Sequence, residues 1–197
     1  MELLSTLSWV TILIFMIAST VLASVALRRP RLAPVIIAGG FLAAALALAA
    51  LPFDSPPLPV ALALGLLGLV LAVIGGGPAA TVVLEAATRG SVRQGTHGGI
   101  LLARSDARVP DTGYLAPPKT EEVMRGGLVI GLLERLAVAA ALMAGYLGAF
   151  AVVVAVKGVG RFTELAESES RERFIIGTLT SLVWATAAAG VWVLSVG

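Results

Sequence analysis

The sequence contains no cysteine and a single histidine, His97. It therefore has no disulfide and no thiol nucleophile, and one imidazole lacks the partners that a metal site built from His or Cys requires. Charge is also scarce, because Asp, Glu, Lys and Arg make up 13% of the residues, against roughly 25% in an ordinary soluble domain. With a mean hydropathy of +0.97, these shortages exclude a soluble globular protein and favour a polytopic membrane protein without metal or cofactor.

Long charge-free stretches are what the chain does have. They cover residues 3–27, 32–53, 55–84, 136–156 and 174–197. Each holds the ~20 apolar residues with which a helix crosses a ~30 Å hydrocarbon core, and none shows the alternating ~10-residue pattern of barrel strands. The fold class is therefore predicted to be all-α, a bundle of transmembrane helices. The first stretch is predicted to be a retained helix, because no basic residue precedes it and it exceeds the ~7 to 15 apolar residues of a signal peptide.

The region from Gly126 to Gly158 decides how many spans there are. A single helix of this length would extend roughly 50 Å, well beyond the bilayer. Two helices that reverse at about Tyr146, inside Gly145-Tyr146-Leu147-Gly148, fit better. We expect the first of them to begin near Val123 and the second to continue past Lys157 toward Glu167. This predicts six spans, with five as the alternative.

The placement of basic residues favours six spans. Of the 14 Lys and Arg residues, all but the intrahelical Arg135 then fall at loops or helix ends on one side, while the other side has only Glu2 and Asp54. By the positive-inside rule the basic side is cytoplasmic, so both termini face outward. The organisation predicted is three transmembrane helices in 1–84, a cytoplasmic loop in 85–125, and C-terminal transmembrane helices with a charged hairpin in 126–197. A five-span arrangement would place residues 157–173 outside.

The loop 85–125 offers little chemistry. A segment of about forty residues is too short to form an independent domain unless a disulfide, a metal ion or a similar cross-link stabilises it. We therefore expect this segment to lie against the membrane face. Its six basic and five acidic residues nearly cancel, which gives no reason to expect nucleic acid as a partner. The glycines of Gly95-Thr96-His97-Gly98-Gly99 lack the spacing of a phosphate-binding loop, and His97 is interpreted as a solvated side chain.

The charged hairpin is the informative part. A reversal at Tyr146 places Arg135 level with Lys157, and Glu134 level with Gly158. A charge inside lipid costs at least about 2.5 kcal/mol, so these groups should pair or face a cavity. We expect Glu134 to pair with Lys157 or Arg161, which share a helix face with Glu164, and Arg135 to pair with Glu164 or a lipid phosphate.

Two interpretations of this cluster stay open. It either holds helices together near the cytoplasmic interface, or binds an anionic group, a lipid headgroup or a coupling proton. Gly127 and Gly131 form a small-xxx-small pair that would admit another helix beside Glu134, and Ser181 would add a hydroxyl. The candidate binding residues are Glu134, Arg135, Lys157, Arg161, Glu164, Arg173 and Thr178.

Three segments carry a resemblance to a known family. They are Gly127-x-x-Ile130-Gly131-x-Leu133-Glu134-Arg135, Ala155-x-Lys157-x3-Arg161-Phe162-x-Glu164-Leu165, and Arg173-Phe174-x-Ile176-Gly177-Thr178-Leu179-x-Ser181. Together they resemble the C-terminal part of an uncharacterised family of bacterial, including actinobacterial, integral membrane proteins known as a domain of unknown function. The likeness covers about residues 125–185. It implies the plasma (inner) membrane of a bacterium and supplies no activity.

Two classes of function are compatible with this pattern. The first is a transport protein or a subunit of a membrane complex, with membrane lipids, anionic ones included, and a second copy or another membrane protein as partners. The second is an enzyme that processes a lipid or phosphate headgroup at the cytoplasmic interface, with Glu134 as general base. The second class lacks a recognisable nucleophile or metal-binding set, so we assign no catalytic residue.

Overall fold

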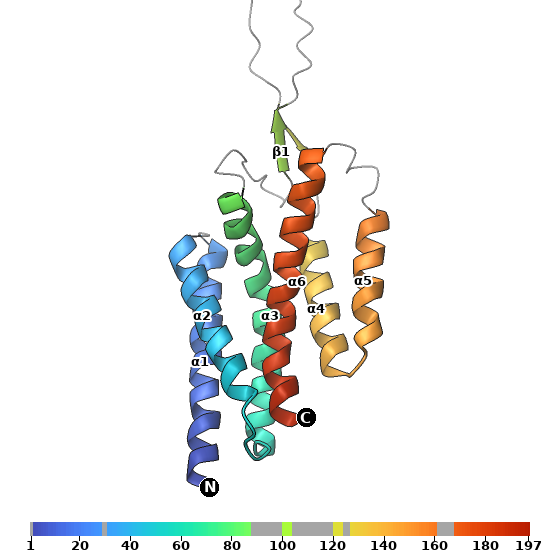
Figure 1. Cartoon of the computed structure of the whole chain (residues 1–197). Coiled ribbons are helices and arrows are strands. Elements are labelled where there is room, and N and C mark those ends of the chain that lie inside the picture. The colour runs from blue at the N-terminus through green and yellow to red at the C-terminus, as the bar shows by residue number, and fades with distance from the viewer. Residues whose placement is uncertain (1, 29–30, 88–99, 104–119, 124–126, 161–167) are drawn as a thin grey trace, which may run out of the picture.

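The computed structural model describes residues 2–28, 31–87, 100–103, 120–123, 127–160 and 168–197. Six helices run up and down along one common axis (Figure 1). They are α1 (Glu2–Arg28), α2 (Leu32–Ala49), α3 (Leu58–Ala87), α4 (Gly127–Met143), α5 (Leu147–Gly160) and α6 (Ser168–Val196). Two short strands, β1 (Ile100–Ala103) and β2 (Thr120–Val123), pair antiparallel beyond one end of the bundle.

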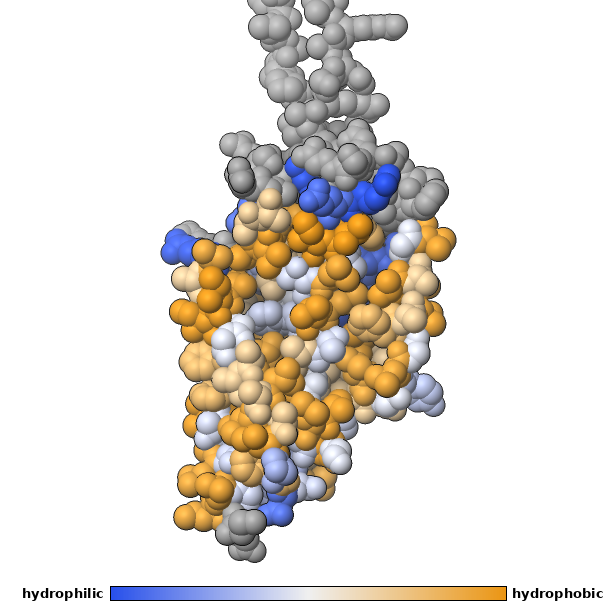
Figure 2. All heavy atoms as spheres, in the orientation of Figure 1, coloured by the Kyte–Doolittle hydropathy of each residue, from blue (hydrophilic) through white to orange (hydrophobic). Residues whose placement is uncertain are grey.

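Four of these helices are long and apolar enough to cross a membrane. The spans are Leu3–Arg28, Leu32–Ala49, Leu58–Ala87 and Arg171–Val196. Large apolar side chains on them point outward, such as Leu3 at 76% and Leu62 at 65% exposure. Figure 2 shows hydrophobic side chains over most of the face of the bundle that is in view. An apolar surface of this extent would be covered by lipid in a membrane protein.

The bundle confirms the helical class, while the start of one helix differs from that expected. α4 begins at Gly127 rather than near Val123, because Thr120–Val123 forms β2 and pairs with the apolar run Ile100–Ala103. α5 is described as far as Gly160, and its expected continuation toward Glu167 falls on residues 161–167, which lie outside the described part of the chain. The all-α prediction thus holds for the bundle and not for this two-stranded hairpin.

The reversal between α4 and α5 lies where the glycines indicate it. Gly145 has a φ of 75°, a left-handed conformation that favours glycine. The Tyr146 amide donates to the Ala141 carbonyl at 2.8 Å and the Gly145 amide to the Leu142 carbonyl at 3.0 Å. This pair of bonds is the Schellman motif that ends a helix. The predicted two-helix hairpin is therefore confirmed.

The centre of the bundle is formed by α3 and α6. α1 and α2 pack on one side of this pair and α4 on the other, and α5 contacts α4 at the periphery (Figure 1). Small residues let α3 and α6 approach closely: a Cβ on Gly68 would lie 2.9 Å from the Ala188 carbonyl oxygen. Ala185, Ala188 and Ala189 are fully buried on α6. Close backbone approach through small residues is the packing that apolar helices use inside lipid.

Both termini lie at the same end of the bundle (Figure 1). At the opposite end, α1 ends, α2 begins, α3 ends, α4 begins, α5 ends and α6 begins. We call this the basic end, because the described lysine and arginine residues outside Arg135 lie near it: Arg28, Arg31, Lys157, Arg171 and Arg173.

Candidate functional site

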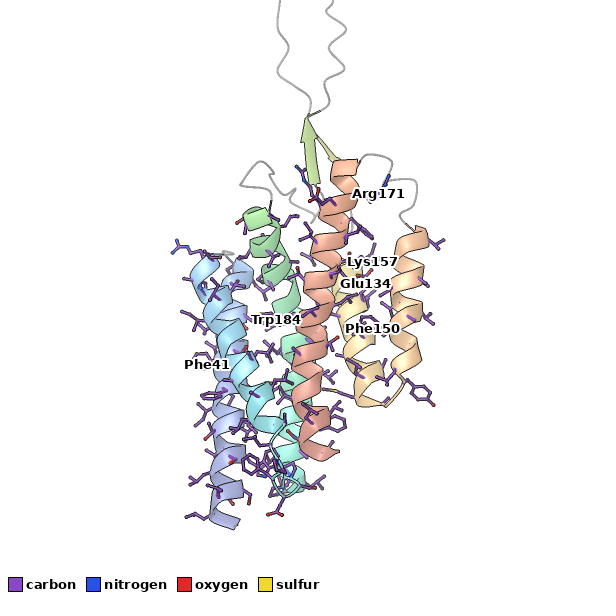
Figure 3. All side chains as sticks on the ribbon, viewed as in Figure 1. Phe41, Glu134, Phe150, Lys157, Arg171 and Trp184 are labelled. Carbon is purple, nitrogen blue, oxygen red and sulfur yellow. The ribbon has the colours of Figure 1, made fainter. Side chains whose placement is uncertain are left out.

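A charged pair joins the two arms of the α4–α5 hairpin. Lys157 of α5 donates a hydrogen bond to the Glu134 carboxylate of α4, and the two side chains are 15% and 12% exposed (Figure 3). The Lys157 ammonium also lies 5.6 Å from the ring centroid of Phe174 on α6, within the range of a cation–π contact. The expected pairing of Glu134 with Lys157 is confirmed.

Arg135 points in a different direction. Consecutive helical residues differ by about 100° around the axis, so Arg135 faces α3 and α6 while Glu134 faces α5. The guanidinium is buried, with 6% of the residue exposed. Its Nε donates to the Val73 carbonyl of α3 at 2.8 Å and its Nη1 to the Ser181 hydroxyl of α6 at 3.0 Å. The partners of Arg135 among the described residues are thus a carbonyl and a hydroxyl, while the expected partner Glu164 lies outside those residues.

Glycines on two helices make room for the Arg135 side chain. A Cβ on Gly76 of α3 would lie 2.5 Å from Arg135 Cδ, and one on Gly131 of α4 would lie 3.2 Å from Arg135 Nη1. Gly131 was expected to admit another helix beside Glu134. It instead accommodates the arginine one turn further along its own helix, because that arginine folds back toward the α3–α6 interface.

The same part of α3 receives a second side-chain donor. Trp184 of α6 donates its indole Nε1–H to the Leu71 carbonyl at 3.1 Å. A few residues further on, Pro78 lies inside the helix and has no amide hydrogen, so it cannot bond the Ile74 carbonyl as a helical residue would. Donors from α4 and α6 thus reach the carbonyls of α3 just before the segment in which glycine and proline weaken that helix.

The other candidate residues fall into two groups. Arg173, near the start of α6, is buried at 6% exposure, and Thr178 is half-buried one turn before Ser181. Arg161 and Glu164 lie outside the described residues, as do His97 and the glycines around it. Sequence reasoning missed Val73 and Trp184 as parts of this site. The run Gly75-Gly76-Gly77-Pro78 inside an apolar stretch was the one signal pointing there.

The described site carries a surplus of positive charge. The single carboxylate of Glu134 stands beside two cations, Arg135 and Lys157. On the visible face, hydrophilic side chains lie near the upper end of the bundle, next to apolar ones (Figure 2). Within the described ranges no three His, Cys, Asp or Glu side chains are grouped to hold a metal ion. The arrangement is suited to bracing helices and to attracting an anion.

Comparison with known proteins adds no name to this arrangement. The chain matches no family model, no curated protein and no solved structure at a significant level. The class defined by the fold is therefore the one the helices themselves establish: a helical bundle with four segments able to span a membrane.

Proposed function

We propose that the chain is a multi-pass protein of the bacterial plasma membrane with six spans, its basic end in the cytoplasm and both termini outside. The clustering of described basic residues at one end of the bundle supports this orientation. α4 and α5 have 17 and 14 residues, about 26 and 21 Å at ~1.5 Å per residue, and would cross a locally thinned bilayer. Because they form a hairpin, the side of the termini is the same whether or not the hairpin crosses completely.

Within that membrane we propose a role as a subunit of a transport or other membrane complex that binds an anionic group at its charged hairpin. The observation that carries this role is a cluster of three charges in an otherwise apolar bundle: the Glu134–Lys157 pair and, one residue along α4, the cation Arg135, which is bonded to a carbonyl and a hydroxyl. An intramembrane charge is costly and is retained where it serves packing or a site. Here Arg135 braces α3 against α4 and α6, and Lys157, less deeply buried, attracts the anion.

The proposed partners are anionic membrane lipids and a second membrane protein or copy of this chain. The three segments that resemble the uncharacterised bacterial family contribute Glu134, Lys157 and Ser181 to one neighbourhood, which supports membership as part of the same proposal. A phosphate group would meet the ammonium of Lys157 at the boundary where lipid headgroups lie.

Topology is tested with reporters. A reporter inserted at Asp54 and one fused after Gly197 should both report the outside, whereas one inserted near Arg104 should report the cytoplasm. A cytoplasmic C-terminal reporter would contradict the six-span orientation.

Anion binding is tested by thermal unfolding of the purified protein in detergent with added phosphatidylglycerol or phosphatidylcholine. We expect phosphatidylglycerol to raise the melting temperature more, and Lys157→Gln to reduce that difference. The matched control is Arg28→Gln, an exposed cation at the same end of the bundle. Equal effects of the two variants would leave the cluster with its bracing role only.

A further inference from the structure

A groove separate from the charged cluster runs between α2 and α6. Its volume is about 510 Å³, within the ~300 to 1,000 Å³ of small-molecule sites. In Figure 1 these two helices flank α3, which contributes the base of the groove. The lining is apolar apart from the hydroxyl of Thr180, and it runs along α2 from Val35 to Leu46 and includes Trp184 of α6.

Small residues create this groove. A Cβ on Gly39 of α2 would have Trp184 Cζ3 of α6 as its nearest atom, at 3.6 Å. Ala43, one turn along α2 from Gly39, and Ala79 of α3 add little bulk. The indole nitrogen of Trp184 is engaged by the Leu71 carbonyl, so the polar atom of that ring is already satisfied. What the groove offers an occupant is therefore hydrocarbon contact.

The length and position of the groove match one leaflet of a bilayer. On α2 its lining runs from Val35 to Leu46, about 17 Å at ~1.5 Å per residue, close to half of a ~30 Å hydrocarbon core. It begins one turn below Arg31, an exposed cation at the basic end. The first turn of α2 carries no acidic residue to neutralise it. Arg31 thus places a positive charge one turn from the start of an apolar groove that is about one leaflet long.

We propose that this groove binds one acyl chain of an anionic phospholipid of the adjoining leaflet, with the lipid phosphate at Arg31. A phospholipid combines an anionic group and an apolar chain in this order and over this length, and arginine presents a fork of donors to phosphate. A transmembrane helix is a poorer fit: at ~10 Å width, 17 Å of it would occupy about 1,300 Å³, more than twice the groove volume. The site involves none of the residues of the Glu134–Lys157 pair.

The groove is tested with the fluorescence of Trp184. The full chain carrying Trp9→Phe and Trp192→Phe, which leaves Trp184 as its single tryptophan, is reconstituted in phosphatidylcholine with increasing fractions of phosphatidylglycerol whose acyl chains are brominated and quench indole on contact. We expect quenching to saturate at low mole fraction, with a preference over brominated phosphatidylcholine of about fivefold, the effect of one arginine near an anionic surface. Arg31→Gln should abolish the preference and Arg28→Gln should keep it.

A second pair of variants separates the groove from the general lipid surface. Gly39→Leu places a side chain in the groove beside Trp184, whereas Gly40→Leu, at a neighbouring position with nothing within 4 Å of its Cβ, is the matched control. Quenching should fall with Gly39→Leu and persist with Gly40→Leu. Quenching proportional to the bulk fraction of either lipid, or equal in the two variants, would overturn the proposal.

Native mass spectrometry of the unsubstituted chain gives an independent reading if the tryptophan replacements impair folding. We expect the number of phosphatidylglycerol molecules retained per chain to fall by one with Ala43→Phe. Retention of none, or a dimer whose formation removes the quenching, would overturn the lipid assignment. Lys157→Gln should leave Trp184 quenching intact and Gly39→Leu should leave the stabilisation dependent on Lys157 intact, so this proposal and anion binding at the charged hairpin fail separately.

Discussion

The α3–α6 interface and the α4–α5 hairpin hold their helices by different means. Glycines of α3 meet the backbone and the indole of α6, and Ala185, Ala188 and Ala189 are completely buried there. None of residues 147–159 of α5 is fully buried, and this helix is joined to α4 by the Glu134–Lys157 pair and partly buried side chains such as Phe150 and Val153. Close packing is intolerant of added volume, whereas a charged attachment is sensitive to the loss of one partner.

The most damaging small change should lie in the close-packed interface. Gly75→Ala would place a Cβ 2.2 Å from Trp184 Nε1 and 2.5 Å from its Cε2, on a rigid ring already bonded to Leu71. We expect the free energy of unfolding in detergent to fall by about 3 kcal/mol, at the upper end of overpacking effects. Gly40→Ala, with open space around its Cβ, should be neutral or slightly stabilising. Similar values for the two variants would refute the difference between close-packed and open positions.

Arg135 links the two regions, and its removal should rank next. Arg135→Met keeps much of the volume but loses the hydrogen bonds to Val73 and Ser181, with an expected cost of about 2 to 3 kcal/mol for charge-assisted bonds. Ser181→Ala should cost less, since the Val73 bond remains. Chemical denaturation of both variants measures the difference. If Arg135→Met stabilised the protein, the desolvation free energy of the buried guanidinium would exceed the stabilisation from its two hydrogen bonds.

The hairpin pair is best tested by a double-mutant cycle. Glu134→Gln and Lys157→Met should each destabilise the protein, and the double variant should recover about 1 to 2 kcal/mol relative to additivity, as expected for directly contacting groups. Hydrogen exchange should also rise in α5 before it rises in α6. Strictly additive losses would show that the pair does not hold α5 in place.

The smallest expected effect concerns Phe174. Phe174→Leu removes the ring beneath the Lys157 ammonium and should cost about 0.5 to 1 kcal/mol beyond the change in apolar contact. That extra cost should vanish in a Lys157→Met background, which thermal unfolding of the four variants would show. A cost that is the same in both backgrounds would assign it to packing alone.

Much of the hairpin could be predicted from the sequence because it is local. Gly145 and Tyr146 interrupt an apolar run too long for one helix. Counting residues from that point places Glu134 level with Gly158, one residue from Lys157, with which it pairs. The boundary of α4 was harder to predict, since Thr120–Val123 becomes a strand only through pairing with Ile100–Ala103. Pairing between distant segments leaves little signal in either segment alone.

The partners of Arg135 could not be predicted in this way. Val73 is 62 residues away in the chain and Ser181 is 46 residues away, and both bonds depend on how α3 and α6 are rotated toward α4. The helices must likewise be packed before Gly76 leaves space for the Arg135 side chain and Gly39 leaves space beside Trp184. A glycine-rich apolar segment indicates close approach without saying what approaches.

The sequence by itself determined that this chain forms apolar helices, and that the described basic residues other than Arg135 lie toward one end of them. The free energy of transferring a segment from water into the bilayer is a sum over its residues, and the positions of the charges can be read along the chain. Neither requires knowledge of which residues are neighbours in space. Only the tertiary structure decided that Glu134 and Arg135, adjacent in sequence, serve different contacts, and that α2, α3 and α6 leave a groove. Those outcomes follow from helix rotation and from the meeting of small and large side chains across interfaces, which are properties of pairs of helices.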